Sequence, residues 1–231
     1  MDKIYYQLKL INNIPFGTFT GFPAFTLFST AYSGQARDRN FINSLEQTLG
    51  REITYVNQVH GSKIITASAG GNKGEGDGLV ITGNNLGAVF TADCLPIVLT
   101  DISGEHTAIV HAGWPGSLAG IAVLAAEKLR EASGKEILAA IGPAANSCCY
   151  EVGQDLVEKF EKKWPLYVNK VIRKNNDKIF LDLSTFNEII LKAVGVEVFQ
   201  SQICTICSSN YHSYRRDKTV LRQLSLVGRR I

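Results

Sequence analysis

Residues 107–116 read TAIVHAGWPG and carry an apolar, strand-like run directly into the start of a helix. The run ends in His111, and an alanine-rich stretch with helical spacing follows at 116–132. Proline is favoured in the first turn of a helix, which gives Pro115 a sufficient structural reason. The stretch therefore predicts a strand, an imidazole at its end, and a helix immediately after it.

Similar short β-type runs, separated by turn signals, occur along much of the chain. They lie at 25–29, 52–61, 63–68, 79–82, 87–92, 96–101, 136–142 and 196–201. Further helical patterns lie at 39–49, where Gly50 is placed as a C-terminal cap, and at 151–163 and 184–194. Because hairpin-like and crossover-like connections are mixed, we expect an α+β fold with mixed sheets and helices outside.

Three local expectations are more specific. The run at 63–68 is expected to pair with the run at 52–61. The glycine-rich segment GGNKGEGDG (70–78) is flanked by apolar runs, so we interpret it as a long surface loop and not as a domain linker. On the helix at 116–132, the spacing places one set of apolar residues on a single face: Leu118, Ile121, Leu124, Ala125 and Leu129.

The composition is that of a globular protein. Of the 231 residues, 45% are hydrophobic and 19% are charged, which is enough for a core without disulfides or a structural metal. The net charge of +3 is small and the basic residues are scattered, which argues against nucleic-acid binding. We expect neither a membrane span nor a signal peptide. Five cysteines, an odd number, are a poor disulfide framework, so we expect free thiols and a cytoplasmic protein.

Three chemically active side chains stand at predicted strand ends. His60 follows the run ITYVNQV, Cys94 follows the run at 87–92, and His111 follows TAIV. Strand ends are places where side chains leave a core and can meet in a shared site. Two imidazoles and a thiolate can hold a zinc ion with one position open to water, which is the arrangement of a catalytic zinc. The metal would lower the pKa of that water, and Asp93 could orient a histidine or transfer a proton.

The same residues allow other interpretations. A partly buried thiol and two hydrogen-bonded histidines are a common structural outcome. Cys94 could instead be a nucleophile whose thiolate is generated by His111. Copper also binds two histidines and a cysteine, but the chain has only four histidines and a single methionine, Met1. Zinc is therefore favoured over copper.

Two further segments leave their roles open. The segment CTIC (204–207) is a lone CxxC, and a four-cysteine zinc site would need a second matching pair. The adjacent cysteines at 148–149 have the wrong spacing for that pair, so ordinary cysteines are favoured. Arg215 and Arg216 either belong to a solvated charged turn or bind a phosphate or carboxylate.

Taken in order, these segments resemble the motifs of a known family. NQVHG (57–61), TADCLP (91–96) and HAGW (111–114) resemble the three site motifs of the YfiH/YlmD family. Its members have been called polyphenol oxidases or laccase-domain proteins, purine nucleoside phosphorylases and peptidoglycan editing factors. The resemblance runs from about residue 28 to the C-terminus, and its further matches are GDG (76–78), IGP (141–143), CCYEVG (148–153) and SYRRD (213–217).

The resemblance implies a single domain, residues 1–231, with a layered α/β/β/α core similar to the catalytic domain of cytotoxic necrotizing factor, a Cys-His deamidase. It implies zinc bound by His60, Cys94 and His111. The implied reactions are phosphorolysis of adenosine, inosine, guanosine and methylthioadenosine, and deamination of adenosine. The partners are then small molecules, a purine nucleoside and phosphate, and the residues expected to contact them are Asp77, Arg215 and Arg216.

Two departures from the family pattern concern phosphate. Pro115 stands where the family usually has a basic residue, and the segment 31–34 lacks the arginine and paired glycines that tend to occur there. Phosphorolysis needs a bound anion, whereas hydrolytic deamination does not. Two alternatives stand beside the nucleoside enzyme. One is a hydrolase of peptidoglycan precursors with Cys94 as nucleophile or zinc ligand, and the other is a nucleoside-binding protein without activity.

Overall fold

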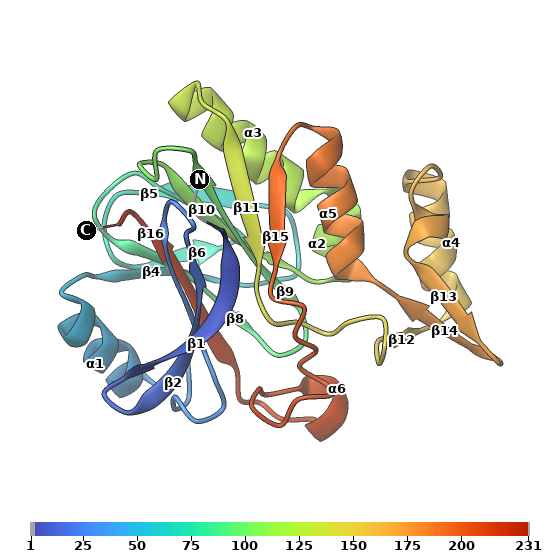
Figure 1. The fold of residues 1–231 in the computed structure, drawn as a ribbon, viewed down its shortest axis with the longest axis horizontal. Coiled ribbons are helices and arrows are strands. Elements are labelled where there is room, and N and C mark those ends of the chain that lie inside the picture. Colours follow the sequence, from blue (N-terminus) through green and yellow to red (C-terminus); the bar gives the residue numbers. More distant parts are fainter. Residues whose placement is uncertain (1–2, 231) are drawn as a thin grey trace.

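The computed structural model describes residues 3–230 and contains two large β-sheets packed face to face (Figure 1). The first sheet has seven strands in the spatial order β1-β2-β3-β16-β8-β4-β6. Their bounds are β1 (Tyr5–Ile11), β2 (Ile14–Thr20), β3 (Phe25–Ser29), β16 (Gln223–Gly228), β8 (Leu86–Thr91), β4 (Ile53–Asn57) and β6 (Gly71–Glu75). Strand β4 runs parallel to β6 and β8, and the other pairs are antiparallel, so the sheet is mixed.

The second sheet has six strands in the order β15-β11-β9-β10-β7-β5. Their bounds are β15 (Glu197–Gln200), β11 (Ile137–Ile141), β9 (Leu95–Asp101), β10 (Thr107–Ala112), β7 (Gly78–Ile81) and β5 (Ile64–Ala67). This sheet is also mixed, because β5 pairs with β7 and β11 pairs with β15 in parallel. A small third sheet contains β12 (Glu151–Val152), β14 (Lys178–Leu181) and β13 (Ile172–Asn175).

Helices lie on the outer faces of the two large sheets and in a projection at one side, and none of those within residues 3–230 is long and apolar enough to cross a membrane. They are α1 (Arg39–Leu49), α2 (Trp114–Ala119), α3 (Ile121–Ser133), α4 (Gln154–Lys163), α5 (Leu183–Ala193) and α6 (Tyr214–Asp217), with a 3₁₀ turn at Val168–Lys170. Helix α1 packs Ile42 and Leu45 against the first sheet, and α3 and α5 pack against the second. The layer order is therefore α/β/β/α, as predicted.

Strand β10 shows how the sequence produces this layering. Its residues Ala108 and Val110 face the helices, while Ile109 faces the first sheet. All six residues of the strand are buried, because both faces of the second sheet are covered, and the sequence therefore reads as a continuous apolar run. Side chains alternate along a strand, so His111 shares the face of Ile109 and points between the two sheets.

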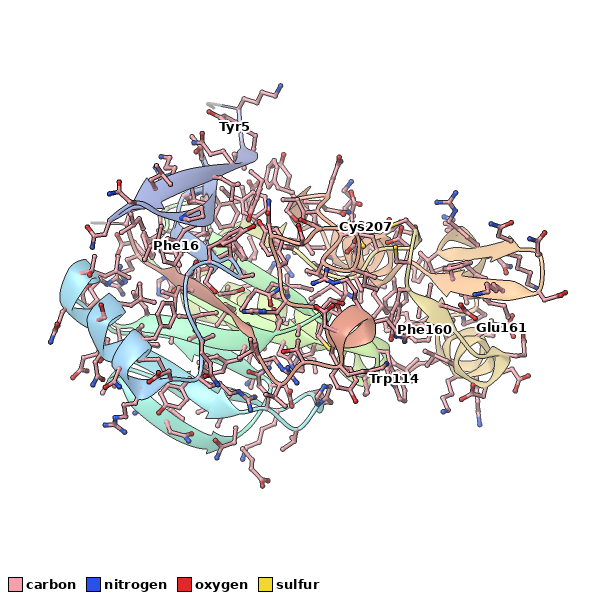
Figure 2. The ribbon with its side chains drawn as sticks, turned by 90° about the horizontal axis from the view of Figure 1, so that it is seen from below. Tyr5, Phe16, Trp114, Phe160, Glu161 and Cys207 are labelled. Atoms are coloured by element: carbon pink, nitrogen blue, oxygen red, sulfur yellow. The ribbon has the colours of Figure 1, made fainter. Side chains whose placement is uncertain are left out.

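Helix α4 and the small third sheet project from one side of the layered body (Figure 1). Phe160 of α4 is fully buried and meets Phe186 of α5 edge to face, with 5.0 Å between ring centroids. Figure 2 shows Phe160 at the junction between the projection and the rest of the molecule. The aromatic contact attaches the projection to the main core, and both belong to one apolar cluster.

Several predicted elements are confirmed. The helix at 39–49 has the predicted bounds, and Gly50 caps it with a φ of 62°, in the left-handed region that favours glycine. The strand at 107–112 is also confirmed at both ends. The predicted helix at 116–132 is present, but Gly120, with a φ of 82°, divides it into α2 and α3.

Other local expectations are wrong. The segment 70–78 is not one long loop, because residues 71–75 form β6 beside β4. The run at 63–68 does not pair with 52–61, since β5 lies in the second sheet and β4 in the first. Strands β1, β2, β12, β13, β14 and β16 were not predicted, and the helix expected at 151–163 begins at Gln154 because residues 151–152 form β12. In β16, which lies in the interior of the first sheet, all six residues are buried, although Gln223 and Ser225 interrupt the apolar pattern.

The packing of α3 predicts how two leucines differ in their contribution to stability. Leu129 is fully buried against the second sheet, whereas Leu124 is 39% exposed, although the sequence placed both on one face. Leu129→Ala should lower the free energy of unfolding by about 2–5 kcal/mol, because it leaves a cavity in the core. The matched variant Leu124→Ala should change it by about 0.5 kcal/mol or less. Urea unfolding of both variants measures the difference, and equal losses would contradict this packing.

Candidate metal centre and active site

The structure brings His60, Cys94 and His111 together. One ligand atom of each residue lies within 4.8 Å of the other two, and the two imidazole centroids are 4.7 Å apart. His60 comes from the loop after β4 in the first sheet, whereas Cys94 directly precedes β9 and His111 lies on β10, both in the second sheet. The group therefore sits at the end of the layer between the sheets, and sulfur and nitrogen donors of this kind suit zinc.

The loop that carries His60 is held by one buried carboxylate. Asp77 accepts backbone N–H bonds from Val59 at 3.2 Å, His60 at 3.0 Å and Gly61 at 2.6 Å. His60 itself has a φ of 62°, an unusual value for a residue with a side chain. The three hydrogen bonds stabilise this backbone conformation and so fix the direction of the imidazole.

The same carboxylate orients His111. Its Oδ1 lies 2.8 Å from His111 Nδ1, and both side chains are buried. A carboxylate is an acceptor, so it favours a proton on Nδ1 and leaves Nε2 free to bind a metal. Asp77 was predicted to contact substrate or phosphate, but it is fully buried and its oxygens already accept four hydrogen bonds. Its place in the structure is that of a positioning residue.

The environment of Cys94 favours a thiolate. Burial alone would raise the pKa of the thiol, but hydrogen bonds and charge interactions with His111 and His60 outweigh it and lower the pKa to about 6. Burial alone would lower the pKa of His111, but its bonds to Asp77 and Cys94 raise that pKa to about 9. In the absence of a metal, the two groups therefore favour a thiolate–imidazolium pair.

Gly113 allows the ligands to come this close. A Cβ atom built at Gly113 would lie 3.1 Å from Cys94 Sγ and 3.2 Å from His60 Cδ2. Both distances are shorter than ordinary van der Waals contacts, so a side chain here would push the two ligands aside. The next residues begin α2, and Pro115 occupies its first turn, which confirms the structural reason inferred from the sequence.

Two of the three residues, His60 and Cys94, line a cavity of about 290 Å³ with an aromatic wall, and the buried His111 lies behind them. Tyr150 is half-buried in this wall, and the guanidinium of Arg215 lies over its ring, 5.1 Å from the centroid. Arg215 Nη1 also donates to the carbonyl oxygen of Glu151 at 2.7 Å. The cavity is lined by His60, Ala92, Asp93, Cys94, Gly113, Trp114, Ala145, Tyr150, Leu183, Tyr214 and Arg215. Its flat aromatic groups and one cation suit a planar, polar ligand.

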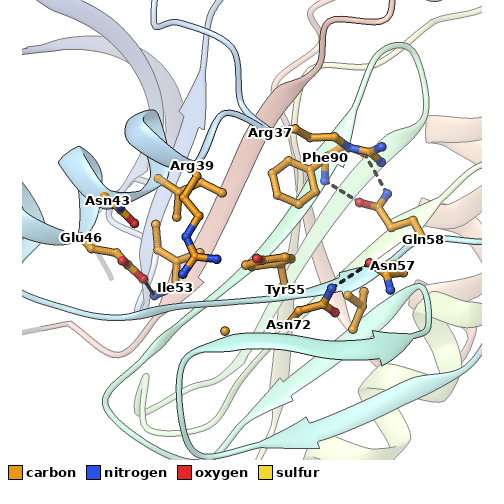
Figure 3. A pocket seen from close by; sticks show the side chains of 13 residues that line it. Arg37, Arg39, Asn43, Glu46, Ile53, Tyr55, Asn57, Gln58, Asn72 and Phe90 are labelled. Atoms are coloured by element: carbon orange, nitrogen blue, oxygen red, sulfur yellow. Dashed lines mark hydrogen bonds between the residues drawn. The ribbon is translucent and has the colours of Figure 1, made fainter.

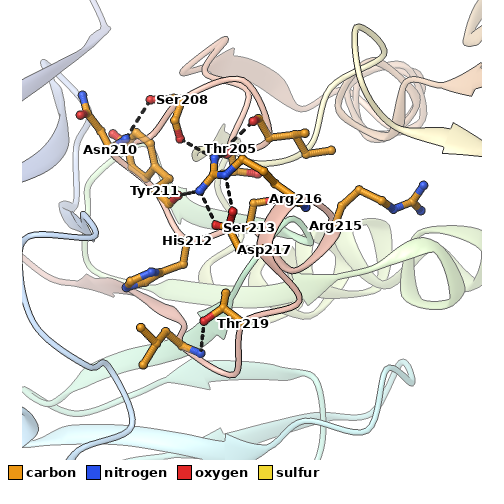
Figure 4. A network of polar contacts seen from close by, with 12 residues as sticks. Thr205, Ser208, Asn210, Tyr211, His212, Ser213, Arg215, Arg216, Asp217 and Thr219 are labelled. Atoms are coloured by element: carbon orange, nitrogen blue, oxygen red, sulfur yellow. Dashed lines mark hydrogen bonds and ion pairs between the residues drawn. The ribbon is translucent and has the colours of Figure 1, made fainter.

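Arg216 does not point into this cavity. Its guanidinium donates to the backbone oxygens of Thr205 at 2.8 Å, Ser208 at 2.9 Å and Tyr211 at 2.9 Å, and it pairs with Asp217 at 2.6 Å. Figure 4 shows Arg216 inside this network and Arg215 pointing the other way. Of the two arginines predicted to bind phosphate, only Arg215 lines the cavity, because the contacts of Arg216 are used to hold a loop.

Asp93 joins the segment that carries Cys94 to the loops around it. Its Oδ1 accepts a hydrogen bond from Thr205 Oγ1 at 2.7 Å, and its Oδ2 accepts one from the backbone N–H of Arg215 at 2.7 Å. Its φ of 91° again lies in the left-handed region. Both carboxylate oxygens thus have partners, so these contacts position the neighbouring Cys94 and the start of α6.

A larger cavity of about 610 Å³ lies between α1 and the first sheet (Figure 3). Arg37, Arg39 and Tyr55 contribute to its lining, which contains no histidine or cysteine. On its wall, Gln58 exchanges two hydrogen bonds of 2.8 Å with the backbone of Phe90. Because Gln58 is two residues before His60, these bonds further fix the ligand loop.

The sequence did not predict roles for the aromatic residues of the smaller cavity. Trp114, Tyr150 and Tyr214 each stand beside a residue that was singled out, within HAGW, CCYEVG and SYRRD. Their position in the motifs was the available signal. The remaining four cysteines also meet: the sulfurs of residues 148, 149, 204 and 207 lie within 4.8 Å of one another. The expectation that 148–149 could not complete a site with 204–207 is therefore wrong in its geometry.

The comparisons with known proteins show which proteins this chain is similar to. Residues 34–230 match the sequence model of a family described as multi-copper polyphenol oxidoreductase laccase. A purine nucleoside phosphorylase of Clostridium acetobutylicum is 30% identical over 215 residues, which cover 87% of this chain and 89% of that protein. An adenosine deaminase, RL5, from an unknown prokaryotic organism is 38% identical over 136 residues, 55% of this chain and 52% of that protein.

The fold has close counterparts among solved structures. The crystal structure of YlmD from Geobacillus stearothermophilus superposes with a TM-score of 0.84 and 25% sequence identity. The superposition covers 97% of this chain and 99% of that one. The two-sheet architecture, with its helices on both outer faces, is therefore shared over nearly the whole length of both proteins.

The contacts of Asp77 predict that it governs metal affinity. Asp77→Asn removes the charge that orients His111 and weakens the hold on the His60 loop, so the affinity for zinc should fall about 10–100-fold. Competition with a coloured chelator measures the change. Asp101→Asn is a matched control, because Asp101 is buried and pairs with His106 at 2.7 Å, at the opposite end of β10. A control variant that lost as much zinc affinity would contradict the specific role of Asp77.

The pKa of Cys94 predicts the pH dependence of its alkylation. In metal-free protein, the rate of reaction with iodoacetamide should rise through about pH 6 and level off near neutral pH, because the thiolate forms above the lowered pKa. Mass spectrometry of the peptide that contains Cys94 follows this residue separately from the exposed cysteines. Added zinc should protect Cys94. A rate that still rose steeply above pH 8 would show that the thiol has an ordinary pKa.

Proposed function

The chain belongs to the family described as multi-copper polyphenol oxidoreductase laccase, and from this membership we propose that it is a zinc-dependent enzyme acting on purine nucleosides. The proposed reactions are phosphorolysis of adenosine, inosine, guanosine and methylthioadenosine, and hydrolytic deamination of adenosine. The observation that carries the proposal is that His60, Cys94 and His111 meet beside an aromatic cavity, which His60 and Cys94 line. The names of two relatives, a purine nucleoside phosphorylase and an adenosine deaminase, support it.

The three residues fit a catalytic zinc. They offer two imidazoles and one thiol of lowered pKa, and Asp77 behind His111 supplies the carboxylate that zinc-binding histidines commonly have as a partner. When bound, the metal supplies a Lewis acid and an activated water to the cavity. The chain's own residues supply the rest: they fix the donors, hold the substrate and position charge near it.

Purine recognition is assigned to the aromatic wall. Trp114, Tyr150 and Tyr214 line the cavity and offer flat surfaces on which a purine ring can stack. The Arg215 guanidinium, held over Tyr150, places a positive charge in the same wall. Asp93 also lines the cavity, next to Cys94, and its carboxylate can share a proton with a substrate that reaches it.

Phosphate binding rests on few cations here. Arg215 lines the cavity, Arg216 holds a loop through its own contacts, and Pro115 replaces the basic residue usual in the family. Deamination needs no bound phosphate. We therefore propose that the deaminase activity is well supported by this site and that phosphorolysis depends mainly on Arg215.

This chain has too few histidines for the several copper ions that the family's description names. The chain has four histidines. His106 stands at the opposite end of β10 from His111, which puts about 16 Å of extended strand between them. His212 lies in the loop before α6, where its backbone oxygen accepts a bond from Gln223. The number and placement of the histidines therefore favour one metal centre with three protein ligands over a multinuclear copper centre.

Product analysis of purified, zinc-replete protein tests the proposal. Inosine with phosphate should yield hypoxanthine and ribose 1-phosphate, and adenosine should yield inosine without phosphate. His111→Ala should abolish both reactions, because it removes a metal ligand and the partner of Asp77. The matched control His106→Ala removes another histidine paired with a buried aspartate and should keep both activities. A wild-type protein that holds zinc and forms neither product would overturn the proposal.

A hydrolase of peptidoglycan precursors is the second candidate, and the Cys94–His111 pair is the observation that favours it. The lowered pKa of Cys94, to about 6, and the raised pKa of His111, to about 9, are also those of a thiol nucleophile with its base. The two candidates respond differently to inhibitors. Activity that survives a strong chelator but stops on alkylation of Cys94 would favour the thiol hydrolase, whereas loss under the chelator and recovery with zinc favours the nucleoside enzyme.

A further inference from the structure

Two loops that are 55 residues apart in sequence bring four cysteine sulfurs together at the molecular surface. Cys207 Sγ lies 3.0 Å from Cys149 Sγ and 3.5 Å from Cys148 Sγ, and Cys204 completes the group. All four sulfurs lie within 4.8 Å of one another. Cys148 and Cys207 are exposed and the other two are half-buried, so an ion can reach the group from solvent.

The backbone holds both loops in this arrangement. The amides of Cys149 and Tyr150 both donate to the carbonyl oxygen of Asn146, at 3.0 Å and 2.9 Å, which forms a tight turn. This turn lets two adjacent cysteines approach the same sulfur, which is why their spacing in the sequence was misleading. Between the loops, Thr205 N–H donates to Ala144 O at 3.0 Å, and residues 144 and 204 form a parallel β-bridge.

The backbone around Cys204 suits a thiolate bound to a cation, whereas burial and neighbouring sulfurs raise the pKa of Cys148 and Cys149 while no ion is bound. Two backbone N–H groups, those of Asn146 and Cys207, hydrogen-bond to Cys204 Sγ. The guanidinium of Arg216 donates to the backbone oxygens of Thr205 and Ile206, at 2.8 Å and 3.2 Å, within the loop that carries Cys204 and Cys207. Amide donors and a nearby positive charge both stabilise the negative charge that several thiolates would bring.

The spacing of the sulfurs is that of a tetrahedral site. Zinc–sulfur bonds of about 2.3 Å in a tetrahedron place neighbouring sulfurs about 3.8 Å apart. The group spans this value, with contacts from 3.0 Å upward and none above 4.8 Å. A shift of a few tenths of an ångström at each sulfur, within reach of side-chain rotation, would accommodate the ion.

We propose that Cys148, Cys149, Cys204 and Cys207 bind a second zinc ion, in a closed structural site of four thiolates. The site is separate from the residues proposed for catalysis and does not depend on them. Its two loops carry walls of the catalytic cavity: Tyr150 follows Cys149 directly, and Thr205 next to Cys204 donates to Asp93. The structural zinc would thus hold both loops, and with them these walls of the cavity, in place from outside.

Zinc stoichiometry of the whole protein tests the proposal. Each protein is loaded with zinc under reducing conditions, desalted and analysed by mass spectrometry for metal per chain. His60→Ala combined with His111→Ala removes the catalytic ligands, and this variant should retain one zinc. Cys204→Ser combined with Cys207→Ser should lose that second zinc. Combining all four substitutions should leave none.

Cobalt spectroscopy gives a second readout. It requires neither enzymatic activity nor a stably folded cysteine variant. Cobalt loaded into the His60→Ala, His111→Ala variant should show the intense thiolate charge-transfer and tetrahedral bands of a four-sulfur site. One zinc per chain in this variant, with such a spectrum, supports the proposal even if the wild-type protein has no nucleoside activity. A variant that binds no zinc or cobalt overturns it, as does a Cys149–Cys207 disulfide that persists under the loading conditions.

Discussion

The buried carboxylate of Asp77 is the constraint on which the site depends. It connects the two sheets. It accepts three backbone N–H bonds from the loop after β4, in the first sheet, and one imidazole N–H bond from β10, in the second. A buried charge of this kind is tolerated only when its hydrogen bonds are complete, and here they are. Burial alone would raise the pKa of Asp77, but the bonds from His111 and Gly61 lower it, so the carboxylate stays ionised. One residue thereby fixes two histidines that come from different sheets.

The sandwich architecture explains why this site lies where it does. The layer between the sheets is filled mainly by apolar side chains such as Ile109 and Val98. His111 shares the inward face of Ile109 but stands near the end of β10, and Cys94 stands just before β9. Gly113 then removes the side chain that would separate the ligands. The fold thus brings the three donors together at one end of the layer.

The sequence predicted structural features that depend on neighbouring residues in the chain. It missed features that depend on contacts between residues far apart in the chain. The apolar runs of β10 and the capped helix α1 carry their own signals, and the strand-end argument selected the three donors that the structure brings together. The pairing of β5 with β7 and the strand formed by residues 71–75 depend on which sheet each segment joins, which no local pattern records. The contacts of Asp77 were not predicted for a similar reason, since its side-chain partners are at least 16 residues away in sequence.

The two cysteine-containing sites are connected through a short path of hydrogen bonds and covalent links. Thr205, between the cysteines of the CTIC segment, donates to Asp93, and Asp93 is bonded covalently to Cys94. The other oxygen of Asp93 accepts the N–H of Arg215, whose guanidinium lies over Tyr150, which in turn follows Cys149. The path therefore runs around the cavity, from the four outer cysteines to Cys94 and back. An ion bound by the four outer cysteines would restrain both loops at once, and the restraint would reach Cys94, Arg215 and the aromatic wall without touching a substrate. The unusual backbone of Asp93, with its φ of 91°, is stabilised by these two hydrogen bonds, so a displacement of either loop would be transmitted to Cys94 next to it.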